Sequence, residues 1–163
     1  MHLYRNGVEM SRWSGGFTLI ELLVTMAILA ILLAIGVPSY QSITTSTRMT
    51  AEINGLVAHL QYARSTAIKE GQDVTVGTGG GNNWEGGWSV TDASGTVLKQ
   101  QQAFQGGDTL AANLAAITYD RNGFTANATT LTLHDTANTV AFRKCVVVSL
   151  VGQLTLNKQG ACP

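Results

Sequence analysis

The chain has 163 residues, of which 45% are hydrophobic and only 12% charged, and ten basic side chains balance ten acidic ones. A net charge of zero excludes a whole-chain electrostatic field that would gather nucleic acid or anionic lipid. The composition also excludes a disordered chain, and 18 glycines with few charges are typical of a turn-rich β domain outside the cytoplasm. The length allows one modest domain and an accessory segment.

The accessory segment lies at the N-terminus. Residues 1–16 carry Arg5 and Arg12 against one acid, Glu9, and the following residues 17–37 contain a single ionisable side chain, Glu21. A helix of this length is about 30 Å long, which matches a bilayer core. Its many Leu, Ile, Val and Phe residues, at about −0.4 kcal/mol each, outweigh one carboxylate at about +3 kcal/mol. We therefore expect insertion, with the preceding arginines on the cytoplasmic side.

Three interpretations of this segment remain open from the residues alone. A secretory signal would be cut behind the apolar run, near Ala34-Ile35-Gly36, but a carboxylate inside the run works against that function. A simple transmembrane anchor leaves Glu21 unexplained. The third interpretation places the cut before the apolar run, after Gly16, so that Phe17 becomes the new N-terminus.

The third interpretation is supported by a resemblance. The string from Gly16 to Val24, GFTLIELLV, resembles the processing motif of type IV prepilins and type II secretion pseudopilins. In that family a prepilin peptidase cuts after the glycine and methylates the new terminal amine, which implies cleavage after Gly16 and N-methylation of Phe17. A glutamate at the position of Glu21 is a hallmark of the family. The resemblance further implies a single-pass inner-membrane protein with its head in the periplasm, which then joins other pilins in a pilus or pseudopilus.

Glu21 has a physical task in this picture. A carboxylate buried in apolar surroundings costs several kcal/mol unless it is paired. In a filament of packed N-terminal helices, the positive amine of a neighbouring Phe17 can supply the partner. We interpret Glu21 as a register device that tolerates burial only where a new subunit docks correctly.

The helix is predicted to continue beyond the apolar run. Pro38 should kink it or melt it locally. An amphipathic face at three-and-four spacing then follows, suited to covering a sheet, and Gly71 is a plausible C-cap. That face comprises Ile53, Leu56, Val57, Leu60, Ala63, Ala67 and Ile68.

The remainder of the chain has short, strand-like periods separated by turn signals. The predicted strands are Val74–Val76, Gly87–Val90, Thr96–Leu98, Ala116–Tyr119, Thr130–Leu133, Val140–Leu150 and Gln153–Leu156. The predicted fold class is α+β and pilin-like: a long N-terminal helix packed on a head of antiparallel sheet. The expected domains are a leader at 1–16, a transmembrane or filament-core helix at 17–38, an amphipathic half-helix at 39–71 and a β-rich head at 72–163.

Within the family, two inner motifs resemble the minor-subunit branch that includes the type II secretion pseudopilin H (GspH) and the pilus protein FimT. Residues Asn54 to Gly71 resemble the Ala-Arg-containing helix end of that branch, and Trp84-Glu85-Gly86-Gly87-Trp88 resembles its Trp-x-x-Gly-Trp strand start. The two tryptophans could equally be ordinary core anchors.

The two cysteines, Cys145 and Cys162, fit neither a metal-ligand pattern nor a CxxC redox motif. In an extracytoplasmic head a disulfide between them is the natural interpretation, and it would contribute about 3 kcal/mol in the chain-entropy model. The alternative is a pair of free thiols in a reducing compartment.

DNA binding is the alternative function from a different class, because FimT-type minor pilins are associated with DNA uptake. The last 21 residues carry Arg143, Lys144 and Lys158 and no acid, although residues 72–163 as a whole hold five basic against six acidic side chains. DNA-binding members carry a Gly-Arg-x-Arg motif, and the comparable segment Gly152–Thr155 here reads GQLT. The same three side chains could therefore be a solvated rim.

The sequence thus favours a structural minor pilin or pseudopilin of a type IV pilus or type II secretion filament, with a prepilin peptidase, other pilins and the inner membrane as partners. A major pilin is the runner-up, because the C-terminal cysteine loop resembles that of major pilins. No residue pattern indicates a catalytic group, a metal site or a cofactor, so we expect no enzyme.

Overall fold

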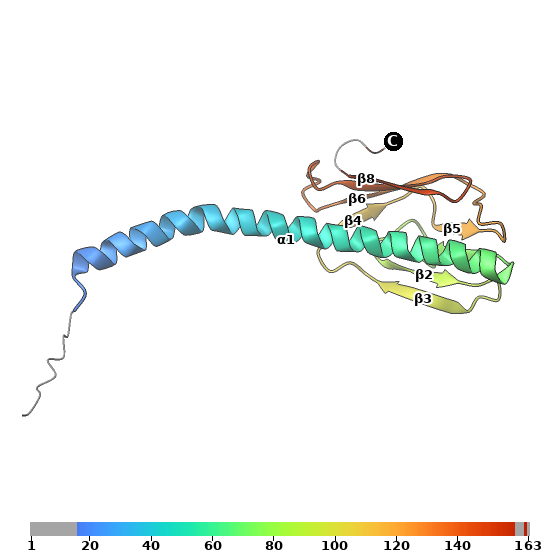
Figure 1. Cartoon of the computed structure of the whole chain (residues 1–163), viewed down its shortest axis with the longest axis horizontal. Helices are drawn as coiled ribbons and strands as arrows, with labels where there is room; N and C mark the ends of the chain where they lie inside the picture. The colour runs from blue at the N-terminus through green and yellow to red at the C-terminus, as the bar shows by residue number, and fades with distance from the viewer. Residues whose placement is uncertain (1–15, 159–161, 163) are drawn as a thin grey trace, which may run out of the picture. The chain divides into compact units, whose positions relative to one another are not determined.

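The computed structural model describes residues 16–158 and 162 (Figure 1). The chain divides into two compact units after Tyr40, and each is described by itself. The first contains the start of helix α1 (Leu19–Glu70). The second contains the rest of α1 and eight strands.

The predicted long helix is confirmed as α1, which begins two residues after Phe17 and ends at Glu70. The helix continues through Pro38, so the expected local melting of the backbone does not occur there. Gly71 caps the C-terminus as predicted: its N–H donates to the carbonyl oxygen of Ala67 at 2.9 Å, and it has a left-handed φ of 69°.

The strands form two antiparallel sheets, and the predicted α+β fold class is confirmed. The first sheet has the order β3-β2-β1-β5 and the second has the order β4-β6-β7-β8. In the second unit, Figure 1 shows α1 running along both sheets, with β2 and β3 on one side of the helix and β4, β6 and β8 on the other. The strands are β1 (Val74–Gly77), β2 (Gly87–Thr91), β3 (Val97–Gln102), β4 (Thr109–Ala111), β5 (Ala116–Tyr119), β6 (Thr129–His134), β7 (Lys144–Val148) and β8 (Leu154–Lys158).

Two strand predictions need correction. The run Val140–Leu150 was expected to be one strand, but β7 begins at Lys144. The preceding residues form turns instead, because the Asp135 carboxylate accepts bonds from the N–H and the hydroxyl of Thr139, at 2.6 and 2.9 Å. The short strand β4 was not predicted, since three residues are too few to show a period of two.

The core lies between the sheets and one face of α1. The helix contributes seven buried residues at three-and-four spacing: Met49, Ile53, Leu56, Leu60, Ala63, Thr66 and Ala67. Ile68 was expected on this face but is 51% exposed, because it lies about 100° around the helix from Ala67. The sheets contribute mainly Val, Leu and aromatic side chains to the same cluster.

The Ala-Arg motif at the end of α1 joins the helix to two distant turns. Ala63 is fully buried in the core. The Arg64 side chain donates from Nε to the Gly123 carbonyl at 3.0 Å and from Nη2 to the Val151 carbonyl at 2.9 Å. A charged guanidinium bonded to two loop carbonyls holds both turns against the helix.

The Trp-x-x-Gly-Trp motif forms a core anchor. Trp84 and Trp88 are both buried, with ring centroids 6.1 Å apart, and their indole N–H groups donate to the Leu114 carbonyl and to His59 Nδ1. Gly87 has a φ of 99°, and a Cβ placed there would lie 2.5 Å from the carbonyl oxygen of Gln101 on β3. The glycine is therefore required for β2 to pair with β3 directly beside the two aromatic rings.

This close approach gives a test with a matched control. Gly87→Ala should lower the free energy of unfolding by about 3 kcal/mol, because it combines a left-handed φ with a backbone collision. Gly95→Ala should cost about 1 kcal/mol, since Gly95 also has a left-handed φ, of 84°, but open space around the added Cβ. Urea unfolding of the full chain in detergent measures both, and equal losses would contradict the account.

Candidate functional site

The predicted processing junction lies ahead of the helix. Gly16 and Phe17 precede the first residue of α1, and the Phe17 side chain is 82% exposed. Gly16 is exposed as well, and a Cβ placed on it would meet nothing within 4 Å. The rest of the predicted leader, residues 1–15, lies outside the described residues.

Thr18 caps the start of α1. The Glu21 N–H donates to Thr18 Oγ1 at 3.2 Å, and the Leu22 N–H donates to the Thr18 carbonyl at 3.2 Å. This arrangement satisfies amide groups that would otherwise have no partner inside the helix. It also places the Glu21 carboxylate in the first turn, where the helix dipole favours a negative charge. The sequence signal was readable, because Thr18 and Glu21 have the spacing of a capping box.

The first helical unit presents an apolar surface on every side. Between Leu19 and Val37, the large apolar side chains are 50–78% exposed. Thr25, a polar residue within this run, donates its hydroxyl to the Leu22 carbonyl at 2.9 Å. Among the described residues, α1 is the one helix long and apolar enough to cross a membrane, with a mean hydropathy of 2.7 over its most apolar window.

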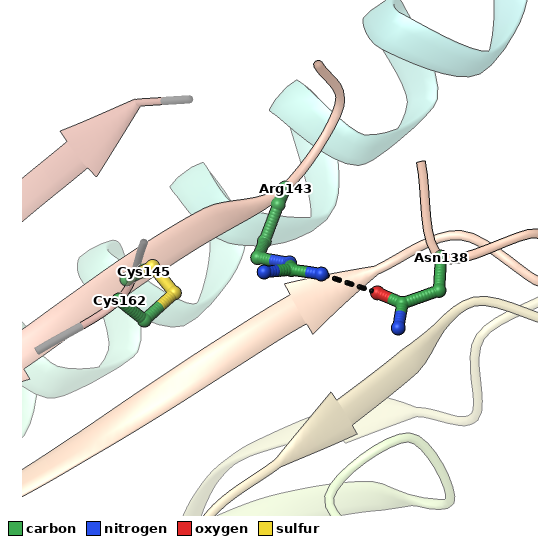
Figure 2. The surroundings of a disulfide bond; sticks show 4 residues. All are labelled: Asn138, Arg143, Cys145 and Cys162. Carbon is green, nitrogen blue, oxygen red and sulfur yellow. Dashed lines mark hydrogen bonds between the residues drawn. A yellow bond between two sulfur atoms is a disulfide. The ribbon is translucent and has the colours of Figure 1, made fainter. Parts of the chain in front are cut away.

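The structure joins Cys145 and Cys162 in a disulfide, with their Cα atoms 5.8 Å apart (Figure 2). Cys145 lies on β7, where it pairs with Asn157 of β8, and its side chain is almost fully buried. The bond therefore links a central strand to the chain that follows the edge strand β8.

The candidate nucleic-acid contacts that the structure describes, Arg143 and Lys144, have different surroundings. Arg143 points toward Asn138, as Figure 2 shows, and its Nη2 donates to Asn138 Oδ1 at 2.8 Å. Lys144 is only 7% exposed, so the structure does not present it to a phosphate, and it does not belong to a solvated rim either. The Lys158 side chain lies outside the described part of the chain.

The disulfide generates a stability prediction. Reducing it with dithiothreitol should lower the free energy of unfolding by about 3 kcal/mol, since the bond closes a 17-residue separation. A Cys145→Ala, Cys162→Ala double variant should be equally destabilised and should no longer respond to the reductant. Urea unfolding with thiol titration checks this, and an unchanged midpoint in the fully reduced wild-type chain would refute it.

Two family profiles match this chain. The family described as "Type II transport protein GspH" matches residues 52–152, which includes the C-terminal part of α1 and most of both sheets. The "Prokaryotic N-terminal methylation motif" matches residues 14–37, which contains the Gly16–Phe17 junction, the Thr18 cap and the apolar helix.

Similar proteins include two described as "Fimbrial protein" from Pseudomonas aeruginosa, each 44% identical over 59 residues. That alignment covers 36% of this chain, and the chain spans 38% of the length of these relatives. Two crystal structures of the type IV minor pilin FimU from Pseudomonas aeruginosa PAO1 share the fold, at 20% and 19% identity and TM-scores of 0.53 and 0.55. These matches cover 70% and 74% of this chain and 90% of each FimU chain.

Proposed function

The chain belongs to the GspH family of type II transport proteins, and on that premise we propose that it is cut between Gly16 and Phe17 and assembles into a filament through its apolar helix. Family and fold are those of structural pilin subunits, so the protein is a minor pilin or pseudopilin of a type IV pilus or type II secretion filament. The cleavage, the methylation of Phe17 and the role of Glu21 are the finer parts of the proposal.

The observation that carries the proposal is the apolar surface of Leu19 to Val37. Burying one Leu or Ile side chain is worth about 1.5–3 kcal/mol, so this surface has a large driving force to leave water. A bilayer covers it while the subunit is a monomer, and the helices of neighbouring pilins cover it in the filament. The capped first turn lets the helix begin directly after the proposed cut.

Glu21 is proposed to select the docked position. It is the single ionisable side chain between Phe17 and Val37, and the Thr18 cap fixes it in the first helical turn. The new amine on Phe17 of an adjacent subunit would offer the opposite charge at the same level of the helix bundle. Pairing offsets the cost of burying a carboxylate, and a misplaced subunit would leave that cost in full.

The remaining partners follow from the same segment. A prepilin peptidase would act on the Gly16–Phe17 bond, and α1 would pass once through the inner membrane before assembly. We place the head in the periplasm, where an oxidising environment would support the Cys145–Cys162 bond.

This proposal predicts a selective defect for Glu21→Ala. The variant should insert and be cleaved normally, because removing a carboxylate makes insertion more favourable. Its incorporation into filaments should fall by about tenfold or more, since the loss of one paired charge costs more than about 1.4 kcal/mol. Glu70→Ala, at the exposed end of the same helix, is the matched control and should incorporate normally.

The measurement is the ratio of subunit in sheared filaments to subunit in membranes, with leader removal followed by the change in size. Normal incorporation of the Glu21→Ala chain would overturn the assigned role of Glu21. An uncleaved Glu21→Ala precursor would contradict the separation of processing from docking.

A further inference from the structure

An ionic cluster lies where α1 first packs on the head. Arg48 forms a two-pronged ion pair with Asp108, the residue before β4: Nε donates to Oδ2 at 2.7 Å and Nη2 donates to Oδ1 at 2.9 Å. The Asp108 side chain is fully buried, whereas Arg48 is about one-third exposed. Met49, the adjacent residue, is the first fully buried residue of the helix, so this pair begins the helix–head contact.

A second carboxylate, that of Glu52, lies beside the same pair and has one buried oxygen without a hydrogen bond. Glu52 lies one helical turn after Arg48, and its Oε2 atom is buried and makes no hydrogen bond. The charged groups acting on this cluster are Arg48 and Glu52 from α1, Asp108 from the segment before β4 and Asp135 from the turn after β6. One guanidinium is thus acted on by three carboxyl groups. If all three are ionised, the cluster carries a surplus of negative charge, which a proton on one carboxylate would reduce.

The two loops that carry these acids are tied to each other. The Thr136 hydroxyl donates to the Gly107 carbonyl at 3.1 Å, and Asp135 holds its own turn through Thr139. Gly106 lies directly under the Arg48 side chain, where any Cβ would collide with the guanidinium stem. A change in charge at Glu52, which acts on Arg48 and Asp108, therefore affects both loops.

We propose that this cluster is a proton-operated latch, in which protonated Glu52 lets Arg48 and Asp108 clamp the first head-packed turn of α1 to the segment before β4. When Glu52 releases its proton to solvent, a second negative charge faces Asp108 across one shared guanidinium. The clamp weakens, and the segment 103–108 opens more often from the helix. The latch goes beyond filament assembly, because it acts inside one head and needs no second subunit.

The electrostatic environment brings the release of the Glu52 proton close to neutral pH. Burial, together with the charge and hydrogen bonding of Asp108, raises the pKa of Glu52 to about 7, against an opposing effect of Arg48. The folded-state pKa is above the unfolded value of 4.5, so the stabilisation is fully present below pH 4.5 and is lost as the pH rises through about 7. The clamped state therefore dominates in mild acid.

The test is hydrogen exchange of the full chain in detergent at pH 5 and pH 8, corrected for the intrinsic exchange rate. Protection of residues 103–111 should be about tenfold lower at pH 8. The full shift of the Glu52 pKa would allow a larger change, but Glu52 is half-buried, so solvent screens part of the effect. Glu52→Gln should keep high protection at both pH values, within about twofold. Glu70→Gln, on the exposed end of the helix, should behave as wild type.

A second measurement reads the proton directly. With ¹³C-labelled glutamate, one side-chain carboxyl should titrate near pH 7, and this signal should vanish in Glu52→Gln. His59, whose pKa is lowered by burial and by Lys99, contributes equally to both chains, so their difference isolates Glu52. Equal pH dependence of exchange in wild type and Glu52→Gln, or titration of every glutamate below pH 5, would overturn the proposal.

Discussion

The apolar surface from Leu19 to Val37 is the constraint on which the rest of the molecule depends. A helix that is apolar on all sides must be covered from water, and its one carboxylate costs several kcal/mol to bury unless it is paired. A bilayer satisfies the first requirement, and a packed filament can satisfy both. The Thr18 cap fixes where this helix starts, so the position of the proposed cut and the position of Glu21 are set together.

In the head, the second part of the same helix is held by packing and by side-chain contacts, not by a membrane or by neighbouring subunits. From Met49 to Ala67 the helix buries one face against two small antiparallel sheets, and Arg64 holds two turns near its C-terminal end. Near the opposite end of that packed stretch, Arg48 and Asp108 make the first tie to the sheets. In a sheet of four short strands, such links between helix and loops supply order that strand pairing alone provides weakly.

The sequence was most informative where an apolar pattern is repeated over many residues. The apolar run and the three-and-four spacing predicted α1 to within two residues at its start, and most strands were found because turn signals separate them. The three-residue β4 has no period to detect, and the turns before β7 depend on Asp135, whose bonds are local but invisible to hydrophobic patterning. Lys144 was grouped with surface cations because burial depends on which face of β7 packs inward. The distant pair Arg48 and Asp108 required the tertiary fold, since 60 positions separate them.

The central claim is that this chain is trimmed at Gly16–Phe17 and carried into a filament by the helix that follows. The most direct test is mass spectrometry of filaments sheared from cells that express the chain at its natural level. The account predicts peptides of the head together with an N-terminal peptide that begins with methylated Phe17. Chain recovered from filaments with residues 1–16 still attached, or chain confined to membranes after complete trimming, would contradict it.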